Sequence, residues 1–213
     1  MIPQHHLPAD IERTSMQIIA KELEERHIRI PRENLAVVKR VIHTTADFEY
    51  AETLHFTENA VQKAIEALHN GATIITDTNM ALSGINKRSL AGLGGEVHCY
   101  MADETVAKLA RERGTTRAAV SMEIAAKIQK PVIFAVGNAP TALIQIYEMM
   151  QGSDWRPAFV IGVPVGFVNV EAAKELILQT DVPFIINRGR KGGSNVAAAI
   201  CNALIYELTR NRS

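Results

Sequence analysis

The 213-residue sequence has no excess of charge of either sign, because Lys plus Arg and Asp plus Glu both number 23. A formal net charge of zero gives no support for binding to nucleic acid or to an acidic membrane surface, and we expect neither partner. A bound anion would therefore need local basic groups. The apolar fraction of 47 % and the charged fraction of 22 % are ordinary for a soluble globular protein.

Cysteine is scarce. Cys99 and Cys201 are the only two, and they form no CxxC or other metal-ligand spacing. Both fall in apolar segments, which favours reduced, buried thiols in a cytoplasmic protein without a metal of its own. The first residues, MIPQHHLPADIE, lack a basic segment followed by an apolar one, so we expect no signal peptide. His5 and His6 are expected to be inert residues of a flexible terminus.

Long hydrophobic runs are also missing. The longest, Ala158 to Val168, is interrupted by Gly162, Pro164 and Gly166 and falls short of the roughly 20 residues that span a bilayer. No internal repeat, low-complexity segment or Pro/Ser-rich linker is present. We expect one domain over residues 1–213.

Strand-like and helix-like stretches alternate along the chain, and six strands are predicted. Their ranges are Val37 to Ile42, Ala72 to Thr76, Glu96 to Tyr100, Val132 to Val136, Ala158 to Val163 and Pro183 to Ile186. Amphipathic helical stripes lie between them. This alternation predicts an α/β fold, a Rossmann-like single domain with a mainly parallel sheet and helices on both faces.

Polar residues follow the predicted strands, and the carboxyl ends of parallel strands share one edge of the sheet, where ligands bind. These residues are His43-Thr44-Thr45, Asp77-Thr78-Asn79, Gly137-Asn138, Pro164 to Phe167 and Asn187-Arg188-Gly189. Together they predict one cleft. His43 is the residue best suited to proton transfer near neutral pH, although it could instead be a hydrogen-bonded core histidine.

The segment Gly189 to Ser194 is rich in glycine and precedes the last predicted helix. Glycines allow close approach of a ligand, a helix N-terminus offers free N–H groups, and Arg188, Arg190 and Lys191 add positive charge. The spacing is neither GxxxxGK[ST] nor GxGxxG, so neither a P-loop nor a dinucleotide site is supported. The segment is either an anion-binding cradle or only a tight turn.

Other polar residues could have an ordinary structural role in place of a functional one. Asp77 could cap a helix, Arg117 could face solvent rather than hold a carboxylate, and Ser15 could be an ordinary polar position of the first helix. His55, His69 and His98 have no metal-ligand spacing and are expected at the surface or at helix ends.

Six stretches, in order along nearly the whole chain, resemble the precorrin-8X methylmutase family of cobalamin biosynthesis. They are RVIHTTADFEY (Arg40 to Tyr50), ITDTNMALSGI (Ile75 to Ile85), TTRAAVSME (Thr115 to Glu123), VGNAPTAL (Val136 to Leu143), IGVPVGFV (Ile161 to Val168) and GRKGGSNVAAAICNAL (Gly189 to Leu204). Two departures stand out. Ala172-Ala173-Lys174 replaces a frequent Glu-Ser-Lys triplet, and Met16 replaces an aromatic residue after Ser15.

The resemblance implies an isomerase that moves a methyl group from C-11 to C-12 of precorrin-8 or cobalt-precorrin-8, giving hydrogenobyrinic or cobyrinic acid. His43 matches the catalytic histidine, which protonates a ring nitrogen and promotes a [1,5]-sigmatropic shift. The resemblance also implies a homodimer with its site near the subunit interface. An intramolecular rearrangement needs a positioned proton donor and a pocket, so no cofactor is expected.

The expected binding partners of the tetrapyrrole's carboxylates and ring are ten residues: Ser15, Thr44, Asp77, Arg117, Asn138, Thr141, Lys191, Gly192, Gly193 and Ser194. Two other functions stay open at this point. One is a phosphate- or nucleotide-binding enzyme that uses the glycine-rich segment, and the other is a corrinoid carrier without catalysis.

Overall fold

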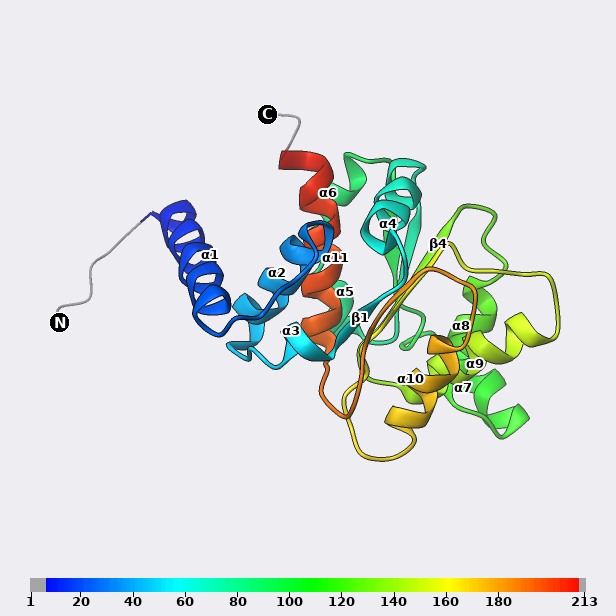
Figure 1. Ribbon diagram of the computed structural model, residues 1–213. Coiled ribbons are helices and arrows are strands. Elements are labelled where there is room, and N and C mark those ends of the chain that lie inside the picture. The colour runs from blue at the N-terminus through cyan, green and yellow to red at the C-terminus, as the bar shows by residue number, and fades with distance from the viewer. Residues whose placement is uncertain (1–6, 211–213) are drawn as a thin grey trace.

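The computed structural model describes residues 7–210, whose strands form one six-stranded sheet with helices on both faces (Figure 1). The strands are β1 (Leu54–Phe56), β2 (Thr73–Thr76), β3 (Glu96–His98), β4 (Val132–Val136), β5 (Phe159–Gly162) and β6 (Phe184–Asn187). Their order is β1-β6-β5-β4-β2-β3. β1 runs antiparallel to β6 at one edge, and the other neighbouring pairs are parallel. The predicted fold class is confirmed.

Eleven α-helices and one 3₁₀ turn occur within residues 7–210. They are α1 (Pro8–Glu25), η1 (Arg32–Asn34), α2 (Leu35–Thr45), α3 (Tyr50–Thr53), α4 (Ala60–His69), α5 (Asn79–Gly84), α6 (Lys87–Ala91), α7 (Glu104–Arg113), α8 (Arg117–Ala125), α9 (Pro140–Gln151), α10 (Val170–Leu178) and α11 (Ser194–Arg210). Local sequence explains several ends: Asp103 and Thr116 cap α7 and α8 through their side chains, and Gly114 ends α7 in the left-handed conformation.

The two faces of the sheet carry separate apolar layers, because successive side chains of a strand point to opposite sides. In β4, Ile133 and Ala135 pack with α2, α4 and α11, whereas Val132, Phe134 and Val136 pack with α8, α9 and α10. Figure 1 shows these two groups of helices on opposite sides of the strands. The central strands are buried on both faces, as a parallel sheet requires.

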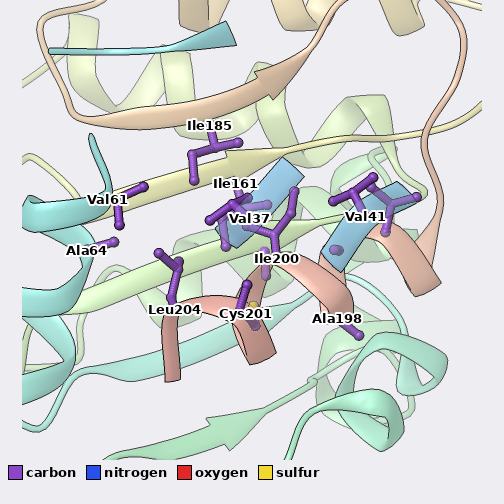
Figure 2. Close-up of a cluster of buried hydrophobic side chains, with 14 of the residues drawn as sticks. Val37, Val41, Val61, Ala64, Ile161, Ile185, Ala198, Ile200, Cys201 and Leu204 are labelled. Carbon is purple, nitrogen blue, oxygen red and sulfur yellow. The ribbon is translucent and has the colours of Figure 1, made fainter. Parts of the chain in front are cut away.

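The strand predicted over residues 37–42 is wrong, since these residues belong to α2. Val37, Val38, Val41 and Ile42 are buried at positions i, i+1, i+4 and i+5, which is a helical stripe. Figure 2 shows Val37 and Val41 in the core that α11 and the sheet also enter. Burial against α11 outweighs the β-propensity of these branched side chains.

The other five predicted strands are confirmed, with ends that differ by at most two residues. The edge strand β1 was missed, because three residues show no alternation to detect. Cys201 is buried and Cys99 half-buried, both as free thiols. Nowhere in residues 7–210 is a helix both long and apolar enough to cross a membrane. His5 and His6 lie outside the described residues.

Candidate functional site

His43 lies in the last turn of α2, not at the end of a strand. Its side chain is exposed, which excludes the alternative of a core histidine. A pocket of about 420 Å³ lies between α1 and α2 where they pack together, and His43 lines it together with Ser15, Ile18 and Arg26. Two residues that are far apart in sequence, His43 and Ser15, therefore face one hollow.

The hydroxyl groups near this pocket are bonded to their own helices. Ser15 Oγ donates to the carbonyl of Ile11 at 2.9 Å, and Thr44 Oγ1 donates to the carbonyl of Arg40 at 2.9 Å. Both oxygens keep lone pairs, so each hydroxyl can still accept a hydrogen bond from a ligand.

Asp77 follows β2 and supports the loop that follows β4. Its Oδ1 accepts from the N–H of Gly137 at 2.9 Å, and its Oδ2 accepts from those of Asn138 and Ala139 at 2.7 and 2.6 Å. The carboxyl group is fully buried, and burial raises its pKa above the ordinary value although the three donors act in the opposite direction. Asp77 thus fixes the position of Asn138, and Thr78, not Asp77, caps α5.

The N-terminus of α11 packs closely on the same loop. A Cβ atom on Gly137 would lie 2.7 Å from the Cα of Ser194, so only glycine allows this approach. Ser194 Oγ and Thr78 Oγ1 are 2.7 Å apart and share a hydrogen bond. The ends of β2 and β4 and the start of α11 therefore meet at one edge of the sheet, as the sequence predicted.

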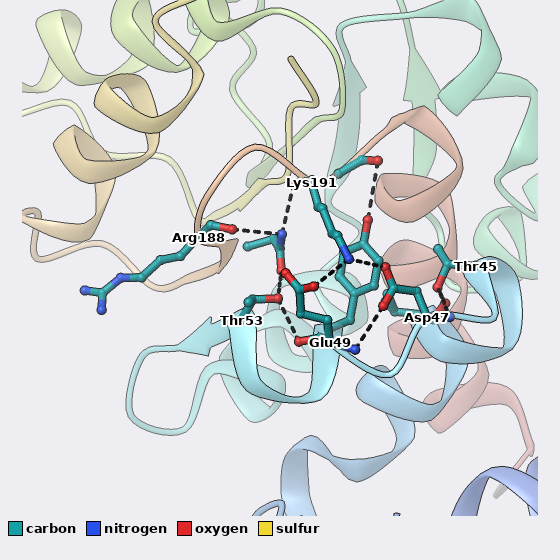
Figure 3. A network of polar contacts seen from close by, with 10 residues as sticks. Thr45, Asp47, Glu49, Thr53, Arg188 and Lys191 are labelled. Carbon is teal, nitrogen blue, oxygen red and sulfur yellow. Dashed lines mark hydrogen bonds and ion pairs between the residues drawn. The ribbon is translucent and has the colours of Figure 1, made fainter. Parts of the chain in front are cut away.

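The glycine-rich loop between β6 and α11 joins this edge to the segment after α2. Lys191 Nζ donates to Asp47 Oδ2 at 2.6 Å and to Glu49 Oε2 at 2.7 Å (Figure 3). These carboxylates raise the pKa of Lys191 above its usual value, and Lys191 lowers that of Asp47. The Tyr50 hydroxyl also lies 3.5 Å from the carbonyl oxygen of Gly192. The loop is thereby connected to the end of the helix that carries His43.

Arg117 and Thr141 lie at the starts of α8 and α9. The Thr116 hydroxyl donates to Thr141 Oγ1 at 2.9 Å, which joins the two helix starts. Arg117 is exposed and lines a hollow of about 700 Å³ with Lys108 and Arg111. Glu104 also lines this hollow, and Lys108 pairs with Glu112, so Arg117 and Arg111 are the groups best suited to a carboxylate ligand.

The predicted site residues thus occupy three adjoining places. Ser15 and His43 share the pocket between α1 and α2, with Thr44 exposed on the same last turn of α2. The sheet edge and the glycine-rich loop bring together Asp77, Asn138, Lys191, Gly192, Gly193 and Ser194. Arg117 and Thr141 lie at the adjacent helix starts. Direct contacts join the second place to the segment after α2, through Lys191 and Tyr50.

Sequence reasoning missed the residues that hold the glycine-rich loop. Lys174 on α10 is 1 % exposed, and its Nζ donates to the carbonyls of Gly189 and Lys191. The signal was present, because Lys174 falls at i+4 of a buried stripe that also contains Val170, Ala173 and Ile177. Asp47 and Glu49, the partners of Lys191, carried no comparable signal.

No group of three or more His, Cys, Asp and Glu side chains that could hold a metal ion occurs in the part of the chain that the structure describes. His55, His69 and His98 are half-buried or exposed and lie on β1, α4 and β3. His98 contacts Glu96 at 3.1 Å and stacks on Tyr100.

Comparison with known proteins identifies the family. The family model described as precorrin-8X methylmutase matches residues 10–207. The cobalt-precorrin-8 methylmutase of Salmonella typhimurium is 48 % identical over 174 residues, which is 81 % of each chain. The precorrin-8X methylmutase of Pseudomonas aeruginosa is 37 % identical over 92 % of this chain and 94 % of its own.

The solved structures agree with these relatives. The crystal structure of the Thermus thermophilus precorrin-8X methylmutase superposes with a TM-score of 0.84 at 36 % identity, covering 94 % of this chain and 98 % of that one. The chain therefore belongs to the precorrin-8X methylmutase family, whose members are isomerases that move a methyl group within a molecule in cobalamin biosynthesis.

Proposed function

We propose that this protein moves a methyl group from C-11 to C-12 of precorrin-8 or cobalt-precorrin-8, giving hydrogenobyrinic or cobyrinic acid. The observation that carries the proposal is the family match over residues 10–207, combined with an exposed His43 that lines an open pocket together with Ser15. A cytoplasmic location is part of the proposal, and the free thiols of Cys99 and Cys201 support it because they suit a reducing compartment.

In the proposed mechanism His43 protonates a ring nitrogen of the macrocycle. The positive charge draws electrons from the conjugated system, the methyl group leaves C-11 and bonds to C-12, and the nitrogen returns its proton to His43. Substrate and product are isomers, so the cycle consumes no other reactant. A histidine suits this role because its unperturbed pKa lies close to neutral pH.

The remaining site residues hold the carboxylate side chains of the macrocycle. Arg117 offers a guanidinium group that can bind a carboxylate through two parallel hydrogen bonds. Lys191, the loop N–H group of Gly192 and the Ser194 hydroxyl at the start of α11 offer further donors. Gly193 belongs to the same loop, and its own N–H bonds to the carbonyl of Val163. Ser15, Thr44, Asn138 and Thr141 complete the proposed set, and Asp77 acts through the loop that it supports.

A homodimer is part of the proposal. Leu7, Ile11 and Ile18 are 72 %, 50 % and 57 % exposed. Leu7 immediately precedes α1, and their spacing of four and seven residues places them with Ser15 on one helical face. An exposed apolar stripe around a site residue supports a subunit interface beside the pocket.

Turnover is tested by anaerobic incubation of the purified protein with precorrin-8 and, separately, cobalt-precorrin-8, while the visible spectrum is followed. The migration changes the conjugated path, so conversion should alter the spectrum without any added cofactor. The form that is converted identifies the natural substrate. Binding without conversion would instead indicate a carrier, and stabilisation by nucleotides or sugar phosphates alone would indicate a phosphate-binding enzyme.

The role of His43 is tested with His43→Gln. Loss of a general acid typically lowers the rate by about 10²- to 10⁴-fold, and we expect kcat to fall by this amount while corrinoid affinity is retained. His69→Gln is the matched control, since His69 is an exposed histidine in the last turn of α4. An unchanged kcat in His43→Gln would contradict the assignment.

A further inference from the structure

The glycine-rich loop turns its carbonyl groups toward donors within the protein. Asn187 Nδ2 donates to the carbonyls of residues 188 and 191 at 3.1 and 2.9 Å, and Lys174 Nζ donates to those of residues 189 and 191 at 2.7 and 2.9 Å. The N–H of Gly166 donates to the carbonyl of Arg190 at 3.1 Å. Each carbonyl from residue 188 to residue 191 therefore has a donor.

Unlike the carbonyl groups, most N–H groups of the same loop have no hydrogen-bond partner within the described residues. Those of Arg188 and Gly193 bond to the carbonyls of Thr53 and Val163, each at 2.9 Å. Between them, the N–H groups of residues 189–192 have no acceptor anywhere in residues 7–210. Four consecutive free donors followed by a helix N-terminus suit a carboxylate ligand.

We propose that Lys174 is a positioning residue for the substrate, because it binds the loop carbonyls from the protein interior and thereby leaves the N–H groups of residues 189–192 free for a substrate carboxylate. Its ammonium group also places a positive charge beneath the loop. The inference rests on the proposed function, since it concerns the binding of the same anionic macrocycle.

A buried lysine at this position carries an energetic cost. The side chain is 1 % exposed on the apolar stripe of α10, and burial lowers the pKa of Lys174 from 10.5 to about 8. A lowered pKa means that the fold disfavours the charged form relative to water. A methionine would fill similar space without this penalty, but it would leave the carbonyl of Gly189 without its donor. The lysine therefore serves to hold the loop, and it places a positive charge there.

The charge of Lys174 changes over a pH range in which its neighbours keep their charges. Glu171 and Glu175 on α10 pair with Arg190 and Arg188, and Lys191 is held by its two carboxylates. Carboxylates and guanidinium groups are ordinarily charged throughout pH 7–9. Raising the pH through about 8 removes the proton from Lys174. We expect the affinity of the wild-type protein for the anionic substrate to fall over this range.

The decisive comparison is Lys174→Met against wild type, with Lys63→Met as control because Lys63 is an exposed lysine of α4. We expect KM for the converted form of precorrin-8 to rise about tenfold or more, as for a lost hydrogen bond to a charged group, with kcat changed less than about threefold. KM of the variant should not vary between pH 7 and 9, unlike that of wild type. Lys63→Met should behave as wild type.

Binding of cobyrinic acid, followed by absorbance, separates this inference from the proposed function. If wild type binds the acid but converts neither form of precorrin-8, the proposed function fails, while a loss of affinity in Lys174→Met still supports the positioning role. If Lys174→Met binds the acid with the affinity of wild type and with the same dependence on pH, the inference is overturned. If the variant does not fold, a wild-type affinity that stays constant from pH 7 to 9 overturns the inference about Lys174. If the wild-type protein does not bind the acid at all, both the inference and the proposed function are overturned.

Discussion

Asp77 shows how one buried carboxyl group can organise a loop. Its two oxygens accept three N–H groups that follow β4, and no part of the residue is exposed. Those N–H groups would otherwise be buried or half-buried without a partner, which is costly. The side chain thus determines where Asn138 and the start of α9 lie.

Asp77→Asn is expected to destabilise the protein, because an amide offers one acceptor oxygen and directs an NH₂ group at backbone donors. We expect the free energy of unfolding to fall by about 2 kcal/mol or more. Urea denaturation followed by circular dichroism measures this change. Asp154→Asn, at an exposed aspartate after α9, should change it by less than about 0.5 kcal/mol. Equal effects of the two substitutions would argue against the loop-supporting role.

At the scale of elements, the glycine-rich loop owes its shape to close contact with the loop that follows β5. A Cβ atom on Gly192 would lie 2.0 Å from the carbonyl oxygen of Val163. Gly193 donates to the same carbonyl. A side chain at position 192 would force the two loops apart and displace Lys191 from Asp47 and Glu49.

Gly192→Ala is therefore expected to raise KM by about tenfold or more, since it moves the proposed carboxylate site. Gly189→Ala is the matched control within the same loop. Gly189 has a φ of 71° but no atom within 4 Å of an added Cβ, so the control introduces backbone strain of about 1 kcal/mol without a collision. Steady-state kinetics and thermal unfolding of both variants distinguish the effect of a collision with Val163 from the effect of backbone strain alone. Equal KM values would show that the contact with Val163 is unimportant for binding.

At the scale of the whole molecule, two of the three parts of the predicted site draw on opposite ends of the chain. α1 and α2 supply Ser15 and His43, and α11 and the loop before it supply the anion-binding groups. α2 packs between α1 and α11, so one core supports both of these parts. We propose on this basis that residues 1–213 act as a single domain.

The exposed face of α1 leads to a prediction about assembly. Ile18→Glu should convert the proposed dimer to a monomer, because it places a charge in an apolar interface. Light scattering coupled to size-exclusion chromatography measures the mass of both proteins. Glu25→Lys, at an exposed position near the end of α1, is the control and should leave the mass unchanged. A wild-type protein that is monomeric at micromolar concentration would contradict the prediction.

The sequence by itself determined the α/β class, five of the six predicted strands and the grouping of polar residues at one edge of the sheet. These features depend on local patterns: apolar runs such as residues 132–136, and polar residues directly after them. Parallel strands bring such ends together whatever the remaining details are. The motifs around His43 and Gly189 to Ser194 were sufficient to indicate the family.

Only the tertiary structure decided what the branched residues before His43 form and what holds the glycine-rich loop. Val37 to Ile42 satisfy a strand by propensity and a helix by spacing, and packing against α11 selects the helix. Lys174 and Gly189 are 15 residues apart, so their bond depends on how α10 crosses the end of β6. Local sequence cannot encode such a contact, because burial and partner geometry exist only once the chain is folded.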